Sequence, residues 1–278
     1  MAELFDPAIE PVLKDAVGAV RQVSDFEPEL ALILGSGLGP LADEIAADAT
    51  LPYSDLPGFA PSTAPGHAGQ LILGTLQGRR VVAMKGRIHF YEGVTAAQAA
   101  FPVRLMHALG AGTLLVSNAC GGLNPHFGAG ELMLQHDLIN FTFANPLIGP
   151  NDVSRGPRFP VMFDAYDEDY LELARKTARA EDILLREGVY LAVSGPSYAT
   201  RAELRMFRAW GADVIGMSTV HEVLVARHEG MRVLGLSVVT DMALPDGSEH
   251  ADEQQVLDMA AASGPNFRRL VKALLPQL

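Results

Sequence analysis

The sequence predicts an α/β fold: a single domain with a mixed, mostly parallel β-sheet flanked by helices. Short apolar runs alternate with helical patterns along the whole chain, as in proteins whose helices cover a parallel sheet. With 278 residues, of which 49% are hydrophobic, the chain can bury one large core. Two apolar runs joined at Gln77-Gly78 read as a hairpin, which adds antiparallel strands. We therefore expect residues 1–278 to form one domain.

The spacing of apolar residues assigns each element in turn. Helices are expected over residues 7–22, 95–110, 167–180, 200–211, 219–230 and 251–274. Strands are expected over residues 29–35, 71–76, 79–86, 113–119, 131–140, 188–195, 212–217 and 231–240. Pro102 predicts a kink or a break in the second helix, because proline has no N–H for the helical hydrogen bond. Residues 145–160 are rich in proline and glycine and are expected to form a loop.

Composition and charge exclude several classes of protein. The formal net charge of −12 argues against a nucleic-acid partner and against an anionic membrane surface. No run reaches the ~18 consecutive apolar residues of a membrane span, and the acidic start MAELFDPAIE does not read as a signal peptide. The single cysteine, Cys120, rules out an internal disulfide framework and is expected to be a small core residue. A reducing cytoplasm is therefore the expected compartment.

Functional residues are expected directly after strands, because ligands of open α/β sheets bind beyond the carboxyl ends of the strands. The loop GSGLG follows one strand, and its glycines and Ser36 offer backbone N–H groups and a hydroxyl to an anion. Two alternatives stay open. The loop is either a merely tight turn or part of a dinucleotide site, since G-x-G-x-x-A runs from Gly37 and Asp55 follows at a suitable distance.

The segment KGRIHFYEG places Arg87, His89 and Tyr91 at alternate positions, so an extended chain presents them on one face. Together they offer a cation for an oxyanion, a titratable donor and a ring with a hydroxyl. The alternative is a solvated edge strand, which more usually carries lysine and glutamate. In SNACGG a strand ends in small residues, which allow close approach to the backbone by a ligand or by a helix.

Two helix starts also follow strands. Thr219-x-x-Glu222 and Thr200-x-x-Glu203 read as capping boxes, in which the threonine caps the helix. A helix N-terminus attracts anions, so Ser218 can serve a phosphate while Thr219 caps. The sequence has no zinc-ligand spacing, Cys-x-x-Cys pair or Ser-His-Asp order, so neither a metal nor a thiol mechanism is expected.

Taken together, these segments resemble the trimeric purine nucleoside phosphorylases, the family that also contains methylthioadenosine phosphorylase. The match runs in order over nearly the whole chain through GSGLG, PGHAG, KGRIHFYEG, FPVRLMHALGAGTLLVSNACGGLNP, GPNDVSRGPRFPVMFDAYD, SGPSYATRAELRMFRAWGADVIGMSTVHEVLVARHEGMRVLG and the strand ending at Thr240. The resemblance implies a cytoplasmic homotrimer that cleaves purine (2′-deoxy)ribonucleosides with phosphate. The products are the free base and (deoxy)ribose 1-phosphate. Inorganic phosphate is a co-substrate, and no metal or organic cofactor is implied.

The resemblance also implies a role for each site residue. Phosphate is expected to bind Ser36, His67, Arg87, His89, Ser218 and the backbone of Ala119. Ribose is expected to contact Tyr91, Met217 and Glu253, and Phe143 or Phe141 of a neighbouring subunit is expected to close the pocket. The purine is expected to meet Tyr198, Ala199, Ile215, Thr240 and Asp241, the last two at the edge that carries N7 and position 6. His89 and Asp241 are the expected catalytic residues.

Two residues of the base site depart from the family pattern for 6-oxopurines. The position of Ala199 is typically glutamate, which binds N1–H, and the position of Asp241 is typically asparagine, which donates to N7. An ionised aspartate would repel O6, whereas adenine presents an amino donor at position 6. Burial would raise the pKa of Asp241, and a protonated carboxyl can donate to N7. The sequence therefore predicts a preference for 6-aminopurine nucleosides such as adenosine.

The sugar end of the site leaves alternatives. Glu253 stands where the nucleoside phosphorylases usually carry histidine, with His250 one turn earlier, and can accept a hydrogen bond from a 5′-hydroxyl. A methylthio group would favour an apolar residue there, so methylthioadenosine phosphorylase is the alternative within the family. From other classes, a dinucleotide-binding oxidoreductase and a non-catalytic nucleoside-binding module remain. A module without a co-substrate would have little use for Arg87, His89 and Ser218.

Overall fold

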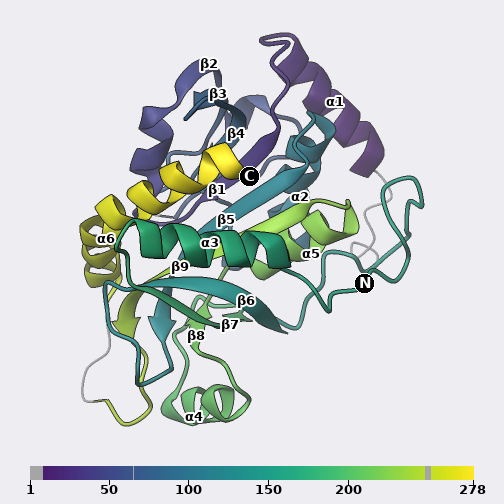
Figure 1. Cartoon of the computed structure of the whole chain (residues 1–278). Coiled ribbons are helices and arrows are strands. Elements are labelled where there is room, and N and C mark those ends of the chain that lie inside the picture. The colour runs from purple at the N-terminus through teal and green to yellow at the C-terminus, as the bar shows by residue number, and fades with distance from the viewer. Residues whose placement is uncertain (1–8, 65, 248–251) are drawn as a thin grey trace.

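The computed structural model describes residues 9–64, 66–247 and 252–278, and within these ranges all nine strands form one mixed sheet (Figure 1). The strands are β1 (Leu30–Leu34), β2 (Ala46–Pro52), β3 (Gln70–Leu76), β4 (Arg79–Lys85), β5 (Thr113–Gly122), β6 (Leu132–Phe141), β7 (Leu185–Val193), β8 (Val214–Gly216) and β9 (Arg232–Met242). The α-helices are α1 (Ile9–Arg21), α2 (Ala96–Ala108), α3 (Glu168–Ala180), α4 (Arg201–Ala209), α5 (Val220–His228) and α6 (Glu253–Leu274). Short 3-10 helices are η1 (Gly39–Glu44), η2 (Tyr53–Asp55), η3 (Phe90–Glu92) and η4 (Leu275–Gln277).

The sheet closes on itself in its second half. The strand order is β2-β3-β4-β1-β5-β8-β7-β6-β9, and β9 also pairs with β5, so that β5, β8, β7, β6 and β9 form a ring. The parallel pairs are β1–β4, β1–β5, β5–β9, β6–β7 and β7–β8. The antiparallel pairs are β2–β3, β3–β4, β5–β8 and β6–β9. The predicted mixed, mostly parallel sheet is confirmed.

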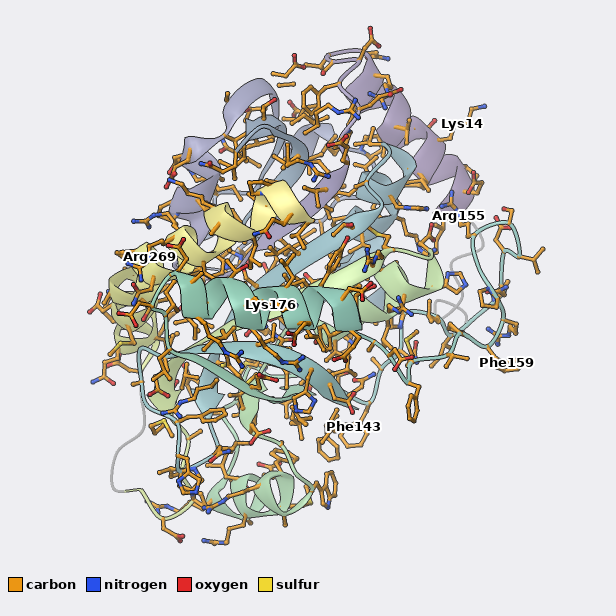
Figure 2. The ribbon with its side chains drawn as sticks, viewed as in Figure 1. Lys14, Phe143, Arg155, Phe159, Lys176 and Arg269 are labelled. Atoms are coloured by element: carbon orange, nitrogen blue, oxygen red, sulfur yellow. The ribbon has the colours of Figure 1, made fainter. Side chains whose placement is uncertain are left out.

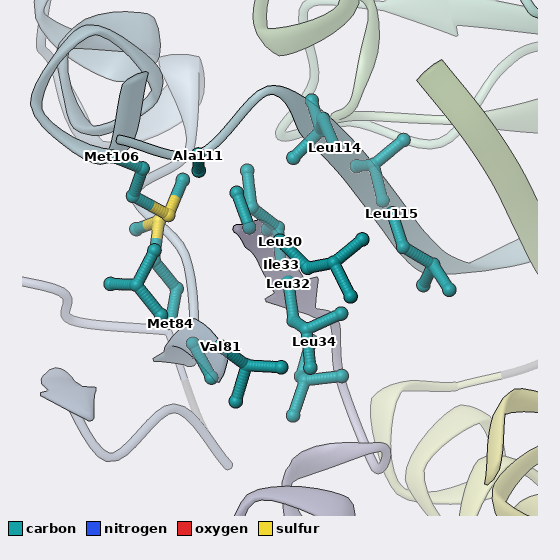
Figure 3. Packing of buried hydrophobic residues seen from close by; sticks show 14 of the residues in the cluster. Leu30, Leu32, Ile33, Leu34, Val81, Met84, Met106, Ala111, Leu114 and Leu115 are labelled. Carbon is teal, nitrogen blue, oxygen red and sulfur yellow. The ribbon is translucent and has the colours of Figure 1, made fainter. Parts of the chain in front are cut away.

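The centre of the core lies around β1, whose five residues are all buried. Leu32 and Ile33 are 0% exposed, as are Leu114 and Leu115 of the neighbouring strand β5 (Figure 3). A strand that pairs in parallel on both sides and is buried on both faces of the sheet usually has a continuous run of apolar residues. The sequence of β1, LALIL, is such a run.

The helices pack in two groups and leave one outside. α2 contacts α1 and α5, while α3 contacts α6, which also lies against β9. α4 stands apart from these helices at the end of the molecule that carries β7 and β8 (Figure 1). The loop that connects β7 to α4 therefore extends beyond the carboxyl ends of the strands, where it can line a binding site. Within the described ranges, every helix is too short or too polar to cross a membrane.

Three expectations about elements are corrected by the structure. Of the kink or break predicted at Pro102, the break is absent: α2 runs through this residue, because a capping box starts the helix and packing against α1 and α5 outweighs one lost hydrogen bond. The sequence of the glycine loop, GSGLGPLA, also predicts the start of a helix, and the loop leads into the 3-10 helix η1 and not into an α-helix. The strand β2 was not predicted, because its residues are mostly alanine and polar and five of the seven are exposed at this edge of the sheet. The first residues of the predicted N-terminal helix, and His250, lie outside the described residues.

Candidate active site

A cavity of about 540 Å³ opens at the carboxyl ends of β5, β7 and β9, beside β8 and the loop before α4. This is the edge at which the sequence predicts a ligand. Of the residues predicted for the site, those that line the cavity are Ser36, Arg87, His89, Tyr91, Ala119, Tyr198, Ala199, Ile215, Met217, Ser218, Thr240 and Asp241.

Three predicted site residues do not line this cavity. His67 lies behind the wall, where it contacts Ser36 and Arg87. Glu253 is the first residue of α6, and that helix reaches the cavity through Val256 instead. Phe143 is 86% exposed and points away from the molecule (Figure 2).

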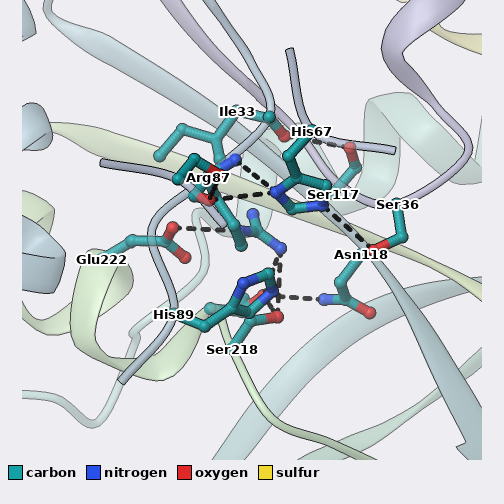
Figure 4. Close-up of polar contacts among 12 residues, drawn as sticks. Ile33, Ser36, His67, Arg87, His89, Ser117, Asn118, Ser218 and Glu222 are labelled. Carbon is teal, nitrogen blue, oxygen red and sulfur yellow. Dashed lines mark hydrogen bonds and ion pairs between the residues drawn. The ribbon is translucent and has the colours of Figure 1, made fainter. Parts of the chain in front are cut away.

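Arg87 is the centre of the polar end of the cavity (Figure 4). Its side chain is 1% exposed, and its Nε donates to Oε1 of Glu222 at 3.1 Å. NH1 donates to Oγ of Ser218 at 3.0 Å and to Oγ1 of Thr219 at 3.4 Å. NH2 is buried and has no hydrogen-bond partner among the described residues. A buried charged donor needs an acceptor, and an oxyanion in the cavity would supply one.

The predicted capping box Thr219-x-x-Glu222 is wrong. Thr219 has a φ of 74°, its side chain does not cap α5, and its hydroxyl accepts from Arg87. Glu222 turns its carboxylate to Arg87 as well. A buried charge left without its partner costs about 3–5 kcal/mol, against about 1 kcal/mol for a missing cap. The second predicted box, Thr200-x-x-Glu203, is present at the start of α4.

His67 supports the polar end from behind. Nδ1 of His67 lies 2.9 Å from the backbone N–H of Arg87 and 3.0 Å from its carbonyl oxygen, and the tautomer of the ring decides which of the two it bonds. Nε2 lies 3.1 Å from Oγ of Ser36. Burial, with the neighbouring His89, lowers the pKa of His67 to about 4 and keeps the ring neutral at pH 7. The ring thus holds the hydroxyl of Ser36 in place at the polar end of the cavity.

The ring of His89 lies between two other rings, 5.0 Å from that of His67 and stacked at 4.7 Å on that of Tyr91. Its Nδ1 lies 3.2 Å from Oε1 of Glu92. An ionised carboxylate can accept a hydrogen bond but cannot donate one. The proton of the neutral ring is therefore on Nδ1, and Nε2 has a free lone pair. Burial lowers the pKa of His89 in spite of this carboxylate. His89 can accordingly accept a hydrogen bond from a protonated phosphate oxygen.

Residues 86–92 do not continue β4, although the sequence predicted an extended segment. β4 ends at Lys85, and η3 follows within the same stretch. Arg87, His89 and Tyr91 still all line the cavity, so the predicted common face is present without a strand. The burial of Arg87 excludes the alternative of a solvated edge.

Asp241 stands at the other end of the cavity. Nδ2 of Asn118, on β5, donates to Oγ1 of Thr219 at the polar end. Gly121 lies three residues, or ~10 Å, farther along the same strand and pairs with Asp241 of β9. Burial raises the pKa of Asp241 above its ordinary value, although Oγ1 of Thr240 lies 3.1 Å from Oδ1 and donates to it. The carboxyl therefore holds its proton more tightly than an exposed aspartate does.

The glycine loop is not a dinucleotide fingerprint. Gly37 has a φ of 74°, and a Cβ on it would lie 2.4 Å from the Cβ of Ala260, so this glycine permits a turn and the close approach of α6. The loop opens the short helix η1, and the strand that follows, β2, runs antiparallel to β3. A dinucleotide site needs an α-helix and a parallel crossover at this point. The side chain of Asp55 is exposed and accepts a hydrogen bond from the hydroxyl of Ser54.

Several functional side chains were missed or misread in the sequence. Glu222 was read as a cap, and Asn118 only as a small residue, yet both surround the anion end. Glu92 orients His89. Only the pair of His89 and Glu92 carries a local signal, since the two residues are three positions apart in the chain. Arg201, at the start of α4, lines the cavity and was not singled out.

Cys120 is a buried free thiol, and burial raises its pKa, as expected for a core cysteine. Its Sγ donates to the carbonyl of Val238 at 3.4 Å. The described residues contain no group of three or more His, Cys, Asp or Glu side chains that could hold a metal ion.

The fold and the site place the chain in a known class of phosphate-dependent enzymes. The model of the Phosphorylase superfamily matches residues 29–276, and the chain belongs to that superfamily. It is 49% identical to purine nucleoside phosphorylase 1 of Bacillus subtilis over 265 residues, which cover 95% of this chain and 98% of the relative. Purine nucleoside phosphorylase of Mus musculus is 44% identical over 92% of this chain and 91% of its own. The resemblance to the purine nucleoside phosphorylases is confirmed.

Solved structures agree with this assignment. The Schistosoma mansoni purine nucleoside phosphorylase in complex with adenosine superposes with a TM-score of 0.91 at 38% identity, covering 97% of this chain and 98% of that one. A Schistosoma mansoni purine nucleoside phosphorylase in complex with inosine gives a TM-score of 0.91 at 36% identity, with 97% of both chains covered.

Proposed function

We propose that this chain is a purine nucleoside phosphorylase that cleaves purine ribonucleosides and 2′-deoxyribonucleosides with inorganic phosphate. The products are the free purine and the pentose 1-phosphate. The observation that carries the proposal is Arg87, a buried cation that lines a cavity whose other end is largely apolar and whose NH2 has no hydrogen-bond partner among the described residues. One end thus suits an oxyanion and the other a flat base.

The residues suggest how the reaction proceeds. Phosphate accepts from Arg87, Ser36 and Ser218, and its remaining hydrogen meets Nε2 of His89. A phosphate oxygen forms a bond to C1′ of the pentose while the bond from C1′ to N9 breaks, and the electron pair of that bond passes to the purine. The pentose carries positive charge at the transition state, which the phosphate dianion stabilises. Most of the acceleration then comes from positioning and charge.

The proposed leaving-group partner is Asp241. Because its pKa is raised by burial, part of the population carries a proton that can be donated to N7 as the base departs. The carboxyl oxygen that has no proton accepts from a 6-amino group. A 6-oxo group offers no hydrogen there, and Ala199 has no group for N1–H. We therefore propose a preference for 6-aminopurine nucleosides such as adenosine.

We also propose a homotrimer in which an aromatic side chain of one subunit closes the pentose pocket of the next. Exposed apolar side chains gather in one stretch of the chain, namely Phe143, Ile148, Val153, Phe159, Val161 and Phe163. Phe143 and Phe159 project outward in Figure 2. A patch of this kind is typical of a surface that another subunit covers. Phe143 remains the proposed closing residue, and the cytoplasm the proposed compartment. Glu253 lies about one helical turn before Val256, which lines the cavity, and remains the proposed partner of the 5′-hydroxyl.

One assay tests the proposal. Base release is measured from adenosine, inosine and methylthioadenosine, each with and without phosphate. We expect release only with phosphate, and fastest from adenosine. Release that does not depend on phosphate contradicts the phosphorylase assignment. A large advantage of inosine contradicts the 6-amino preference, and an advantage of methylthioadenosine favours the alternative within the family.

A further inference from the structure

The cavity continues past Asp241 into a region with an aliphatic wall. The side chains of this aliphatic wall come from the loop before α4, from α4 itself and from the chain after β9, and they are Ala199, Leu204, Ala243 and Leu244. Ala199, Leu204 and Ala243 pack together with Ile215 and Phe207 in one hydrophobic cluster. The wall is thus a firm apolar surface and not a loose rim.

The aliphatic wall stands directly beside the carboxylate. A Cβ built on Gly121 would lie 3.0 Å from the Cβ of Ala243, 3.2 Å from Oδ2 of Asp241 and 3.5 Å from Cγ2 of Ile215, so the three groups converge on one point. NH1 of Arg201, a residue that also lines the cavity, donates to the carbonyl of Pro245 at 2.9 Å. This bond ties the chain after β9 to the start of α4 and holds the wall in place.

A 6-amino group has two hydrogens, and Asp241 can accept only the one that points toward it. The second hydrogen points away from the carboxylate, toward the aliphatic wall. The polar side chains nearby offer it no acceptor. The hydroxyl of Thr200 donates to the carboxylate of Glu203 at 2.8 Å and accepts from the backbone N–H of Glu203 at 3.2 Å. The guanidinium of Arg201 can only donate hydrogen bonds. An aliphatic group in place of that second hydrogen therefore loses no side-chain hydrogen bond and gains apolar contact.

Building on the proposed function, we infer that this enzyme cleaves purine nucleosides whose 6-amino group carries one aliphatic substituent. The reaction is the same phosphorolysis: C1′–N9 breaks, C1′–O to phosphate forms, and the substituted purine leaves with a proton on its ring. The nitrogen of such a substrate keeps one hydrogen for Asp241 and directs its alkyl group to the aliphatic wall. A nucleoside with two substituents has no hydrogen left for Asp241.

The inference is tested with adenosine, N6-methyladenosine, N6-propyladenosine and N6,N6-dimethyladenosine, each with phosphate, and with inosine as a reference. We expect kcat/KM for the two monosubstituted nucleosides to stay within about tenfold of adenosine, and that for the disubstituted one to fall at least about hundredfold. A larger than tenfold fall for both monosubstituted nucleosides, with adenosine still cleaved, overturns the inference alone. Absence of release from both adenosine and inosine overturns the proposed function, and release from inosine alone overturns its 6-amino preference.

Variants of the aliphatic wall supply a second readout. Leu204→Phe and Ala199→Leu fill the space beside the 6-position, and either is expected to lower the ratio of kcat/KM for N6-propyladenosine to that for adenosine by about tenfold or more. Two variants are used so that a folding defect in one leaves the other informative. The matched control is Leu184→Phe, at an exposed position before β7, which should leave the ratio unchanged. An unchanged ratio in both wall variants overturns the inference.

Discussion

Glu222 holds the guanidinium of Arg87 at 3.1 Å in a place where the two side chains are 5% and 1% exposed. The carboxylate balances the charge of Arg87 before any ligand binds, while one guanidinium nitrogen, NH2, stays without a partner among the described residues. Phosphate then meets a preformed pair and not a bare cation. In a protein with a net charge of −12, this local arrangement of donors is what makes an anion site possible.

The first prediction concerns this pair. Glu222→Gln should lower the Tm without phosphate, because Arg87 loses its counter-charge and such a loss costs about 3–5 kcal/mol. Phosphate should raise the Tm of the variant more than that of the wild type, since the anion becomes the main counter-charge. Thermal unfolding with and without saturating phosphate measures both effects.

The matched control for this experiment is Glu187→Gln. Glu187 pairs with Arg175 near the surface, where ion pairs contribute about 0–1 kcal/mol. Its phosphate-induced shift in Tm should equal that of the wild type. Equal phosphate shifts in Glu222→Gln and wild type would contradict the proposed role of the pair.

The second prediction concerns the base. Ala199→Glu combined with Asp241→Asn restores the pair of residues that the family uses for 6-oxopurines. The ratio of kcat/KM for inosine to that for adenosine should rise by about hundredfold or more, because a buried polar mismatch discriminates strongly. Steady-state kinetics on both nucleosides measure it, and the two single variants serve as comparisons. A change of less than tenfold would show that these positions do not select the base.

The third prediction follows from the raised pKa of Asp241. The carboxyl is protonated below that pKa and ionised above it, so its donation to N7 is lost as the pH rises through a value above the ordinary 3.8. kcat/KM for adenosine should therefore have a falling limb toward high pH. Asp241→Asn, whose amide does not titrate, should lack that limb. A pH profile with the same limb in both proteins would assign it to another group.

The fourth prediction concerns stability in acid. Burial lowers the pKa of His67 and that of His221 to about 4, and Nε2 of His221 lies 2.9 Å from Oγ1 of Thr142. Between pH 6.5, where the unfolded rings begin to bind protons, and about pH 4, the unfolded state holds more protons than the folded state. The free energy of unfolding should thus fall as the pH falls through this window, by up to about 1.4 kcal/mol per pH unit for each ring.

Urea unfolding at several pH values tests this directly. His221→Gln should show a smaller slope of stability against pH between pH 6.5 and 4 than the wild type, because one of the buried rings with a lowered pKa is gone. His126→Gln, at an exposed position, is the control and should keep the slope of the wild type. A slope that does not change in His221→Gln would argue that another group is responsible.

The fifth prediction concerns the subunit contact. Phe143 is 86% exposed, so Phe143→Ala should leave the Tm of an isolated protomer nearly unchanged. If Phe143 of a neighbouring subunit closes the pentose pocket, the variant should raise KM for the nucleoside far more than KM for phosphate. Phe159→Ala, at another exposed position, is measured in parallel. A rise in nucleoside KM only in Phe159→Ala would transfer the role to that residue.

Local sequence patterns predicted the secondary-structure elements well, but they predicted poorly which side chains interact with one another. The hairpin at Gln77-Gly78 and the cap at Thr200 rest on residues near each other in the chain, and both are present. Thr219-x-x-Glu222 has the same local pattern as Thr200-x-x-Glu203 but a different outcome, because a buried cation lies beside it. Pro102 is a second such case: proline disfavours the interior of a helix, but the packing of α2 against α1 and α5 outweighs this preference and the helix continues.

By itself, the sequence determined the alternation of strands and helices, the edge of the sheet that binds a ligand, and the residue types that gather there. Asp241 at the carboxyl end of β9 and Arg87 after β4 follow from that alternation, because strand ends meet at one edge. Only the tertiary structure decided that Glu222, 135 residues from Arg87, is its counter-charge, and that an aliphatic wall stands beside Asp241. Periodicity and capping act between residues close in the chain, whereas burial and charge pairing depend on which distant segments pack together.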